Sequence, residues 1–292
     1  MTAARLRRGL LAAALAGACA CSSGAPPRLR DAQAPLAGAA GGYRVLLPPG
    51  YPAASPYPVV YFLHGLLNQS SALWRQGVAQ GLVARMAAGE LPPFVLAAPD
   101  GGNGYWSDAH DGSRAYETWV TGGLRERVEA AYAVRRDRAG RAVIGISMGG
   151  YGALKAGLRH PDLYGQAGSL SGAILRMDWN LVETTFLFNR WALKRSFGRE
   201  RTDNSLAAND LMAVLAAAPL APRARLWLHC GEQDRYGLAA AAARFHAAAG
   251  AAGFVSTLVL EPGDHDWEYW RRSTLAQLAE IANGFAPPAA PG

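Results

Sequence analysis

A serine between two glycines is the strongest chemical signal in this sequence. Gly145-Ile146-Ser147-Met148-Gly149 follows the pattern G-x-S-x-G; an apolar run typical of a buried strand precedes the serine, and helical spacing begins at Gly150. A sharp turn between a strand and a helix holds a serine hydroxyl clear of the sheet, and flanking glycines leave room for the neighbouring backbone. This context predicts that Ser147 is a nucleophile.

A serine hydroxyl becomes reactive when a base accepts its proton and an acid holds that base in one tautomer. His265 follows the apolar run 256–260 and begins the last helical segment, so it is the predicted base. The acid is expected just after the apolar run 225–229, where Glu232 and Asp234 both occur. We favour Asp234 and keep Glu232 as the alternative.

Attack by a serine on a carbonyl produces an oxyanion, which backbone N–H groups can stabilise. The N–H group of Met148, directly after the nucleophile, is one predicted donor. The second is expected from His64-Gly65-Leu66-Leu67, which follows another apolar run, and we assign it to the N–H group of Leu66.

Substrate contacts are expected close to these groups. The glycine-rich loop 101–113 also follows a predicted strand, and its aromatic side chains could stack on a sugar or phenolic ring, although packing against the domain would use the same residues. The expected substrate-binding residues are His64, Tyr105, Trp106 and His110.

Short apolar runs alternate with helical segments along the chain. The predicted strands cover residues 43–47, 59–63, 94–98, 142–146, 166–170, 225–229 and 256–260, and the predicted helices cover 73–88, 116–132, 150–159, 238–249 and 267–283. This alternation predicts an α/β fold with a mostly parallel central sheet and helices on both faces. It stops at an insertion near 172–222, which is expected to form a lid or to pack against the side of the domain.

Composition excludes several other classes of protein. Half of the 292 residues are hydrophobic, which excludes a disordered chain, and no apolar run reaches the roughly 18–20 residues of a membrane-spanning helix. The formal charge of +7 is spread over scattered arginines and does not predict a nucleic-acid partner. No group of cysteine and histidine residues has the spacing of metal ligands, so no metal is expected.

The first 20 residues have the pattern of an export signal. Arg5-Leu6-Arg7-Arg8 precedes an apolar run over 9–18, and small residues follow. Small residues before a cysteine are also typical of a lipoprotein signal, although the leucine stands four rather than three places before Cys19. Lipid attachment at Cys19 or Cys21 and free secretion are both open. The expected location is periplasmic, secreted or lipid-anchored. The expected division of the chain is a signal segment (1–20), a flexible linker (21–41), a catalytic domain (42–286) and a disordered tail (287–292).

Taken together, the motifs resemble the esterase D-like "putative esterase" branch of the α/β-hydrolases over residues 43–285. The resemblance rests on His64-Gly65-Leu66, Pro99-Asp100-Gly101, residues 145–153, His160-Pro161-Asp162, residues 168–172 and His265-Asp266-Trp267-Glu268-Tyr269-Trp270. It implies the α/β-hydrolase fold, a Ser/Asp-or-Glu/His triad, an oxyanion hole at the N–H groups of Leu66 and Met148, and no metal or organic cofactor. The branch includes S-formylglutathione hydrolases, feruloyl and acetylxylan esterases, and mycolyltransferases; the acid of the mycolyltransferases is typically Glu, which keeps Glu232 open.

The sequence therefore predicts an exported serine esterase that hydrolyses short-acyl, carbohydrate-linked or phenolic esters through an acyl-enzyme. The expected partner is a small-molecule or carbohydrate ester. Two alternatives remain. One is an acyltransferase of the mycolyltransferase type, in which an alcohol replaces water; the other is a non-catalytic surface binding protein with the hydrolase fold.

Overall fold

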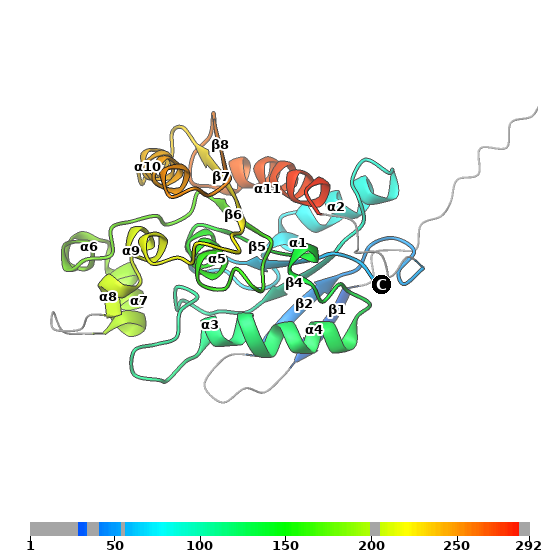
Figure 1. Cartoon of the computed structure of the whole chain (residues 1–292), viewed down its shortest axis with the longest axis horizontal. Coiled ribbons are helices and arrows are strands. Elements are labelled where there is room, and N and C mark those ends of the chain that lie inside the picture. Colours follow the sequence, from blue (N-terminus) through cyan, green and yellow to red (C-terminus); the bar gives the residue numbers. More distant parts are fainter. Residues whose placement is uncertain (1–28, 34–40, 54–55, 199–204, 286–292) are drawn as a thin grey trace, which may run out of the picture.

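The computed structural model describes residues 29–33, 41–53, 56–198 and 205–285 (Figure 1). The predicted signal segment with Cys19 and Cys21, and the predicted tail 287–292, lie outside the described residues. Within the described ranges, no helix is both long enough and apolar enough to cross a membrane.

An eight-stranded sheet forms the centre of the molecule, in the order β1-β2-β4-β3-β5-β6-β7-β8. The strands are β1 (Leu29–Gln33), β2 (Gly42–Leu46), β3 (Val59–Leu63), β4 (Val95–Pro99), β5 (Arg141–Ile146), β6 (Gln166–Leu170), β7 (Arg225–Gly231) and β8 (Ser256–Glu261). The six strands β4, β3, β5, β6, β7 and β8 run parallel to one another. β2 is antiparallel to both β4 and β1. The carboxyl ends of the six parallel strands therefore lie at one edge of the sheet.

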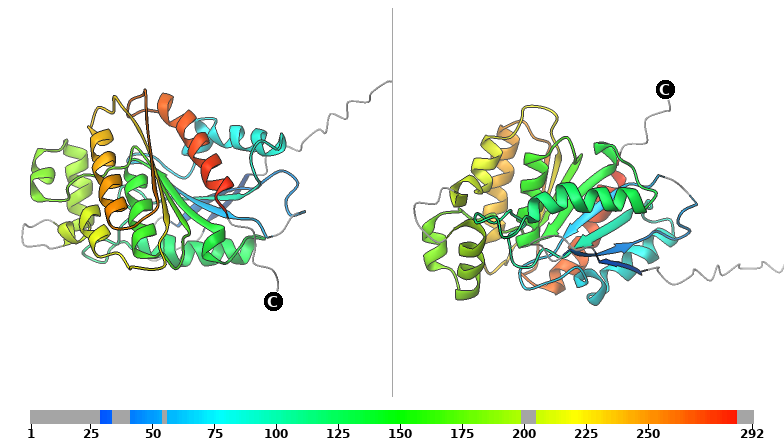
Figure 2. Two further views of the ribbon diagram at one scale, coloured as in Figure 1. Left: turned by 45° about the horizontal axis from the view of Figure 1, so that its top comes forward. Right: turned by 90° about the horizontal axis from the view of Figure 1, so that it is seen from below.

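Helices cover both faces of this sheet (Figure 2). They are α1 (Ala72–Arg75), α2 (Val78–Ala87), α3 (Tyr116–Thr118), the π-helical η1 (Trp119–Leu124), α4 (Arg125–Ala131), the 3-10 turn η2 (Arg138–Gly140), α5 (Met148–Arg159), α10 (Leu238–Ala251) and α11 (Trp267–Asn283). Successive side chains of a strand point to opposite faces. Tyr61 of β3 accordingly packs in one core with η1, α4, α5 and α10, and its neighbour Phe62 packs in a second core with α2 and α11.

The predicted α/β-hydrolase fold is confirmed, with three local differences. The predicted helix 73–88 is divided into α1 and α2, because Gly77 has a φ of 75° and ends the first helix. The predicted helix 116–132 is continuous but contains the π-helical turn η1. The predicted linker 21–41 contains β1, which pairs through its backbone with the free edge of β2. No apolar pattern in the sequence predicts this strand.

The insertion after β6 is helical and lies at one end of the molecule (Figure 1). It contains α6 (Trp179–Thr184), α7 (Leu187–Phe197), α8 (Ser205–Ala208) and α9 (Leu211–Ala216). Asp210 begins α9 by accepting hydrogen bonds from two backbone N–H groups, and its second oxygen accepts one from Met177 at 2.8 Å. The Tyr151 hydroxyl of α5 donates to the carbonyl of Asn209 at 2.7 Å. The insertion is thus fixed to the helix that follows Ser147.

A buried ion pair lies where the insertion meets α5. Lys155 is fully buried; its Nζ atom is 3.1 Å from Glu117 and 3.3 Å from Asn209. Burial lowers the pKa of Lys155 to about 8. Burial by itself raises the pKa of Glu117, but the hydrogen bond from His160 and the charges of Lys155 and Arg159 outweigh it and bring that pKa to about 2.

The Glu117→Gln variant is expected to lower the free energy of unfolding by about 3 kcal/mol at pH 7, because Lys155 loses its buried partner. The folded pKa of Glu117 lies below its ordinary value of 4.5, so its contribution is complete above that pH and disappears as the pH falls towards 2. Urea unfolding at several pH values should therefore show a difference from wild type that shrinks below pH 4.5. Glu126, 69% exposed and paired with Arg125, provides the control: Glu126→Gln should change stability by less than about 1 kcal/mol. A Glu117→Gln difference that is independent of pH would contradict this account.

Candidate active site

The turn between β5 and α5 holds Ser147 in a strained conformation. Its φ of 55° and ψ of −115° lie outside the regions that side-chain-bearing residues favour, at a cost of about 1–3 kcal/mol. The backbone of Ser147 is fixed by hydrogen bonds on both sides, from its N–H group to Leu170 and from Ala173 to its carbonyl. The sequence prediction of a sharp strand-to-helix turn agrees with this geometry.

Gly149 makes this turn sterically possible. A Cβ atom at this position would lie 2.0 Å from the carbonyl oxygen of Leu63, at the end of the neighbouring strand β3. The Gly149→Ala variant is therefore expected to lose about 3 kcal/mol of stability in chemical unfolding. Gly250 of α10 has open space around its Cβ position, so Gly250→Ala should be neutral or stabilising by about 0.5–1 kcal/mol. Equal effects of the two substitutions would refute the steric argument.

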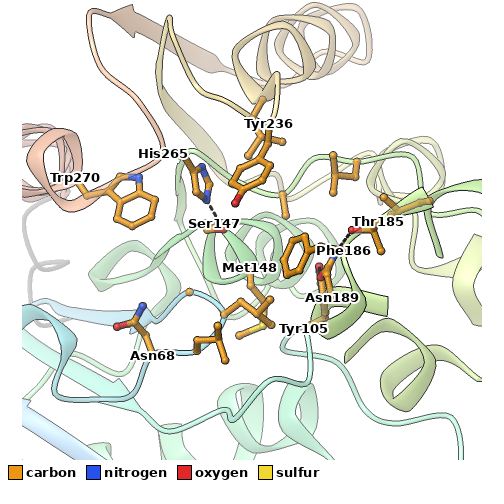
Figure 3. A pocket seen from close by; sticks show the side chains of 17 residues that line it. Asn68, Tyr105, Ser147, Met148, Thr185, Phe186, Asn189, Tyr236, His265 and Trp270 are labelled. Carbon is orange, nitrogen blue, oxygen red and sulfur yellow. Dashed lines mark hydrogen bonds between the residues drawn. The ribbon is translucent and has the colours of Figure 1, made fainter. Parts of the chain in front are cut away.

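Three side chains distant in the sequence meet beside this turn. Figure 3 shows two of them, Ser147 and His265, joined by a hydrogen bond. The Oγ atom of Ser147 lies 3.0 Å from Nε2 of His265, and Nδ1 of His265 lies 2.7 Å from Oδ2 of Asp234. An ionised carboxylate only accepts hydrogen bonds, so Nδ1 carries the proton and Nε2 is free to accept the hydroxyl proton of Ser147. Glu232 is exposed, and among the described residues no hydrogen bond or ion pair joins it to His265, so the geometry distinguishes the two acids that the sequence left open.

Aromatic rings hold the imidazole of His265 on two sides. The rings of Tyr236 and Trp270 each lie edge-on to it, with centroids 4.8 Å away. Trp270 is anchored by a hydrogen bond of 3.1 Å from its Nε1 atom to the hydroxyl of Ser171. The side chain of Asp234 is fully buried, and its second oxygen accepts a hydrogen bond from the N–H group of Tyr236 at 3.0 Å. These contacts restrict both partners of the Asp234–His265 hydrogen bond to one orientation.

Asp264 connects the loop that carries His265 to the loop that carries Asp234. Its carboxylate accepts hydrogen bonds from the guanidinium and the N–H group of Arg235, at 2.6 and 2.8 Å, and from the N–H group of His265 at 2.6 Å. The guanidinium of Arg235, followed by the two N–H groups, holds the pKa of Asp264 well below its ordinary value. Asp266, on the other side of His265, instead begins α11 by accepting from the N–H groups of Glu268 and Tyr269.

This connection predicts different effects for the two aspartates that flank His265. Asp264→Ala is expected to lower kcat for a soluble ester by about 10–100-fold with little change in KM, because small displacements of a catalytic group are costly. Asp266→Ala should leave kcat close to wild type and cost about 1 kcal/mol of stability through the lost helix cap. Steady-state kinetics and urea unfolding of both variants test this contrast. Equal kcat values for Asp264→Ala and wild type would show that the connection does not position the site.

The residues of the two predicted oxyanion donors lie at the same cavity as the Ser147 hydroxyl. Leu66 and Met148 both line the cavity that contains Ser147, and a Cβ atom at Gly65 would lie 3.5 Å from the Cβ atom of Ser147. Within the part of the chain that the structure describes, neither N–H group donates a hydrogen bond to the protein. Both are therefore available to a ligand oxygen.

The cavity beside Ser147 has a volume of about 360 Å³ and mostly apolar walls (Figure 3). The insertion supplies one wall of it. The lining residues that come from the insertion are Ala173, Leu175, Leu181, Thr185, Phe186 and Asn189. Two polar side chains, Thr185 and Asn189, interrupt this wall. Asn189, only 4% exposed, accepts a hydrogen bond from the Tyr105 hydroxyl and donates one to Thr185 at 2.9 Å. Such a cavity suits a small, largely apolar group.

The four residues expected to contact substrate lie in different places. Tyr105 lines the cavity, whereas His64 and Trp106 are buried outside its lining. Nε2 of His64 accepts a hydrogen bond from Gly101, its Nδ1 atom therefore donates to the carbonyl of Gly65, and burial lowers its pKa. Trp106 donates to the carbonyl of His64 at 3.0 Å. Both side chains thus support the segment that carries Leu66 instead of facing a ligand.

His110 lies on a different hollow, beside Trp191 and Lys194, and not at the cavity. Conversely, several cavity residues were not anticipated from the sequence, among them Tyr236, Phe186 and Asn189. Tyr236 lies two residues after Asp234, and this position could have indicated that it lies near the cavity. Phe186 and Asn189 lie in the insertion, whose position no local pattern reveals. Among the described residues, no cluster of three or more His, Cys, Asp or Glu side chains is arranged to hold a metal ion.

Comparison with known proteins yields a family and several relatives. The family described as "Putative esterase" matches residues 38–281. Esterase Rv1288 of Mycobacterium tuberculosis is 35% identical over 147 residues, which cover 48% of this chain and 31% of the relative. The MPT51 antigen of Mycobacterium leprae is 32% identical over 153 residues, which cover 48% of this chain and 50% of the relative. The chain thus matches a third to a half of the length of these curated relatives.

Solved structures show the same fold. A ferulic acid esterase superimposes with a TM-score of 0.72 at 24% identity, covering 89% of this chain and 100% of the other. The fluorophosphonate-binding serine hydrolase FphF of Staphylococcus aureus gives a TM-score of 0.74 at 18% identity, with the same coverage. At these identities the likeness establishes the α/β-hydrolase fold alone. With the family match over residues 38–281, it follows that the chain belongs to the "Putative esterase" family.

Proposed function

We propose that the chain is an exported serine esterase that hydrolyses small carboxylic esters through an acyl-enzyme. The observation that carries this proposal is the continuous hydrogen-bonded series from Ser147 through His265 to Asp234, of which Ser147 and His265 line an apolar cavity. The family match and the relatives named as esterases agree with this class of reaction.

The reaction begins when the Oγ atom of Ser147 attacks the ester carbonyl carbon and Nε2 of His265 accepts the hydroxyl proton. The carboxylate of Asp234 stabilises the imidazolium, and the N–H groups of Leu66 and Met148 bind the oxyanion. His265 then gives its proton to the leaving alcohol as the carbon–oxygen bond to the alcohol breaks. Water, deprotonated by His265, attacks the acyl-enzyme, and the proton returns to Ser147 as the carboxylic acid leaves.

The cavity supports short aliphatic or phenolic acyl groups as substrates. Its apolar walls fit a hydrocarbon or an aromatic ring, and the hydrogen-bonded pair of Asn189 and Tyr105 offers a polar contact for a phenolic hydroxyl. Its volume of about 360 Å³ does not accommodate a long acyl chain in full.

A panel of esters tests this function. Wild type and Ser147→Ala are assayed with p-nitrophenyl acetate, butyrate and palmitate, with methyl ferulate and with acetylated xylan, and glycerol is added as an acceptor in a parallel series. The expected result is hydrolysis of the acetyl, butyryl or feruloyl esters by the wild type alone. Transfer of the acyl group to glycerol in preference to water would show that the protein is an acyltransferase. Inactivity on every ester would favour a non-catalytic binding protein.

The proposed location outside the cytoplasm rests on the N-terminal sequence. Residues 5–8 are basic, 9–18 are apolar, and Cys19 and Cys21 follow. Expression of the full chain in a bacterium, followed by cell fractionation and mass analysis of the mature N-terminus, distinguishes free secretion from lipid attachment. An unprocessed chain in the cytoplasm would contradict export.

A further inference from the structure

Helix α7 of the insertion exposes large apolar side chains to solvent. Leu187 is 80% exposed and Trp191 is 45% exposed; Phe186, directly before the helix, is 50% exposed. Leu187 and Trp191 are four positions apart and therefore lie on one side of the helix. A solvent-facing helix surface normally carries polar side chains, so an apolar one of this kind marks an interaction surface.

Basic side chains continue the same surface. Lys194 and Arg195 lie one turn beyond Trp191, and the guanidinium of Arg195 is 5.0 Å from the centre of the Trp191 ring. Neither cation forms an ion pair with a carboxylate of the described residues. We name Leu187, Trp191, Lys194 and Arg195 the α7 face.

A surface hollow of about 700 Å³ adjoins the α7 face. Trp191, Lys194 and Arg195 line it together with His110, Asp111 and Ser113 from the loop after β4. Among the described residues of this lining, Asp111 alone is acidic, and the exposed Glu183 of α6 is a further carboxylate of the insertion. In the described part of this lining, positive charge therefore predominates.

The α7 face is connected directly to the mouth of the active-site cavity. Phe186 and Asn189, at the start of the same helix, both line that cavity, and Figure 3 shows their side chains beside it. Leu67 and Tyr236 are also cavity-lining residues and are 67% and 54% exposed. Exposed large side chains thus line part of the cavity and continue along α7.

We propose that the α7 face docks on an anionic lipid surface. Aliphatic and aromatic side chains next to cations are the composition of a helix that lies in a lipid–water interface. The apolar residues enter the acyl boundary, while Lys194 and Arg195 contact negatively charged head groups. A second copy of this chain is the poorer occupant, because a two-fold interface centred on this face would bring the cations of the two copies together.

Vesicle binding of the full chain tests the proposal. Wild type is sedimented with vesicles of phosphatidylcholine alone and of phosphatidylcholine mixed with phosphatidylglycerol. We expect binding that rises with phosphatidylglycerol and falls with salt. The double variant Lys194→Gln/Arg195→Gln should bind about 30-fold more weakly, at about fivefold for each charge removed. Leu187→Asn should bind about tenfold more weakly through the loss of apolar burial.

Matched control variants remove an exposed leucine or two exposed cations from other parts of the surface. Leu220 is 84% exposed between α9 and β7, so Leu220→Asn deletes an equally exposed leucine away from α7. Arg85→Gln/Arg271→Gln removes two exposed cations on α2 and α11. These controls should bind as wild type does. All variants keep the same N-terminal segment, so its apolar run contributes equally to each measurement.

Other outcomes would overturn the proposal. They are equal binding by wild type and the α7-face variants, binding that ignores phosphatidylglycerol, or a change in oligomeric state of the variants in solution. Turnover of p-nitrophenyl acetate by every α7-face variant should match wild type and reports on an intact fold. Ser147→Ala should bind vesicles normally, so a failure of docking and a failure of the esterase function are distinguishable.

Discussion

Ser147→Ala is expected to lower kcat for p-nitrophenyl acetate by about 10⁶-fold, because no other group of the site can form the acyl-enzyme. Alanine retains the Cβ atom, so the strained turn between β5 and α5 should persist and stability should stay near wild type. The rate is measured at saturating ester, and circular dichroism confirms the fold of the variant.

The double variant Ser147→Ala/His265→Ala sharpens this test. Nucleophile and base act as one unit across the 3.0 Å hydrogen bond that joins them, so removing both should cost little more than removing Ser147 alone. Two multiplicative losses would mean that His265 acts on something other than Ser147.

Asp234→Asn is expected to have the second largest effect, a loss of about 10⁴-fold in kcat. An asparagine amide can donate to Nδ1 of His265, which moves the ring proton to Nε2 and leaves Ser147 without a base. Asp234 does not line the cavity, so KM should change little.

Glu232→Gln is the matched control for this substitution. Glu232 lies in the same loop but is exposed, so its variant should keep the kcat of wild type. If Glu232→Gln lost activity and Asp234→Asn did not, the assignment of the acid would be reversed.

The sequence predicts which strands end at the candidate site. Ser147, Asp234 and His265 each follow a short apolar run, and in a parallel sheet the ends of such runs share one edge. The sequence favoured Asp234 over Glu232, but strand position does not separate the two, because both lie in the loop after β7. Only the direction of each side chain, buried for Asp234 and exposed for Glu232, separates them.

Other features depended on contacts that sequence patterns do not reveal. His64 and Trp106 lie in loops that follow strands of the sheet, and their side chains could contact a substrate. Instead, Trp106 donates a hydrogen bond to the carbonyl of His64, and the N–H group of Gly101 donates one to the His64 ring, so both side chains support the backbone. The cavity wall from the insertion depends on how α6 and α7 pack, and β1 depends on backbone pairing with β2. In each case tertiary contact, not local pattern, decided the role.

Labelling with a fluorophosphonate tests the central claim most directly. A serine activated by hydrogen-bonded His265 attacks this phosphorus electrophile, so wild type should take up one label, located on the peptide that contains Ser147. His265→Ala should react slower by orders of magnitude. An enzyme that hydrolyses esters while its Ser147 remains unlabelled, or a His265→Ala variant that is labelled as fast as wild type, would contradict the account.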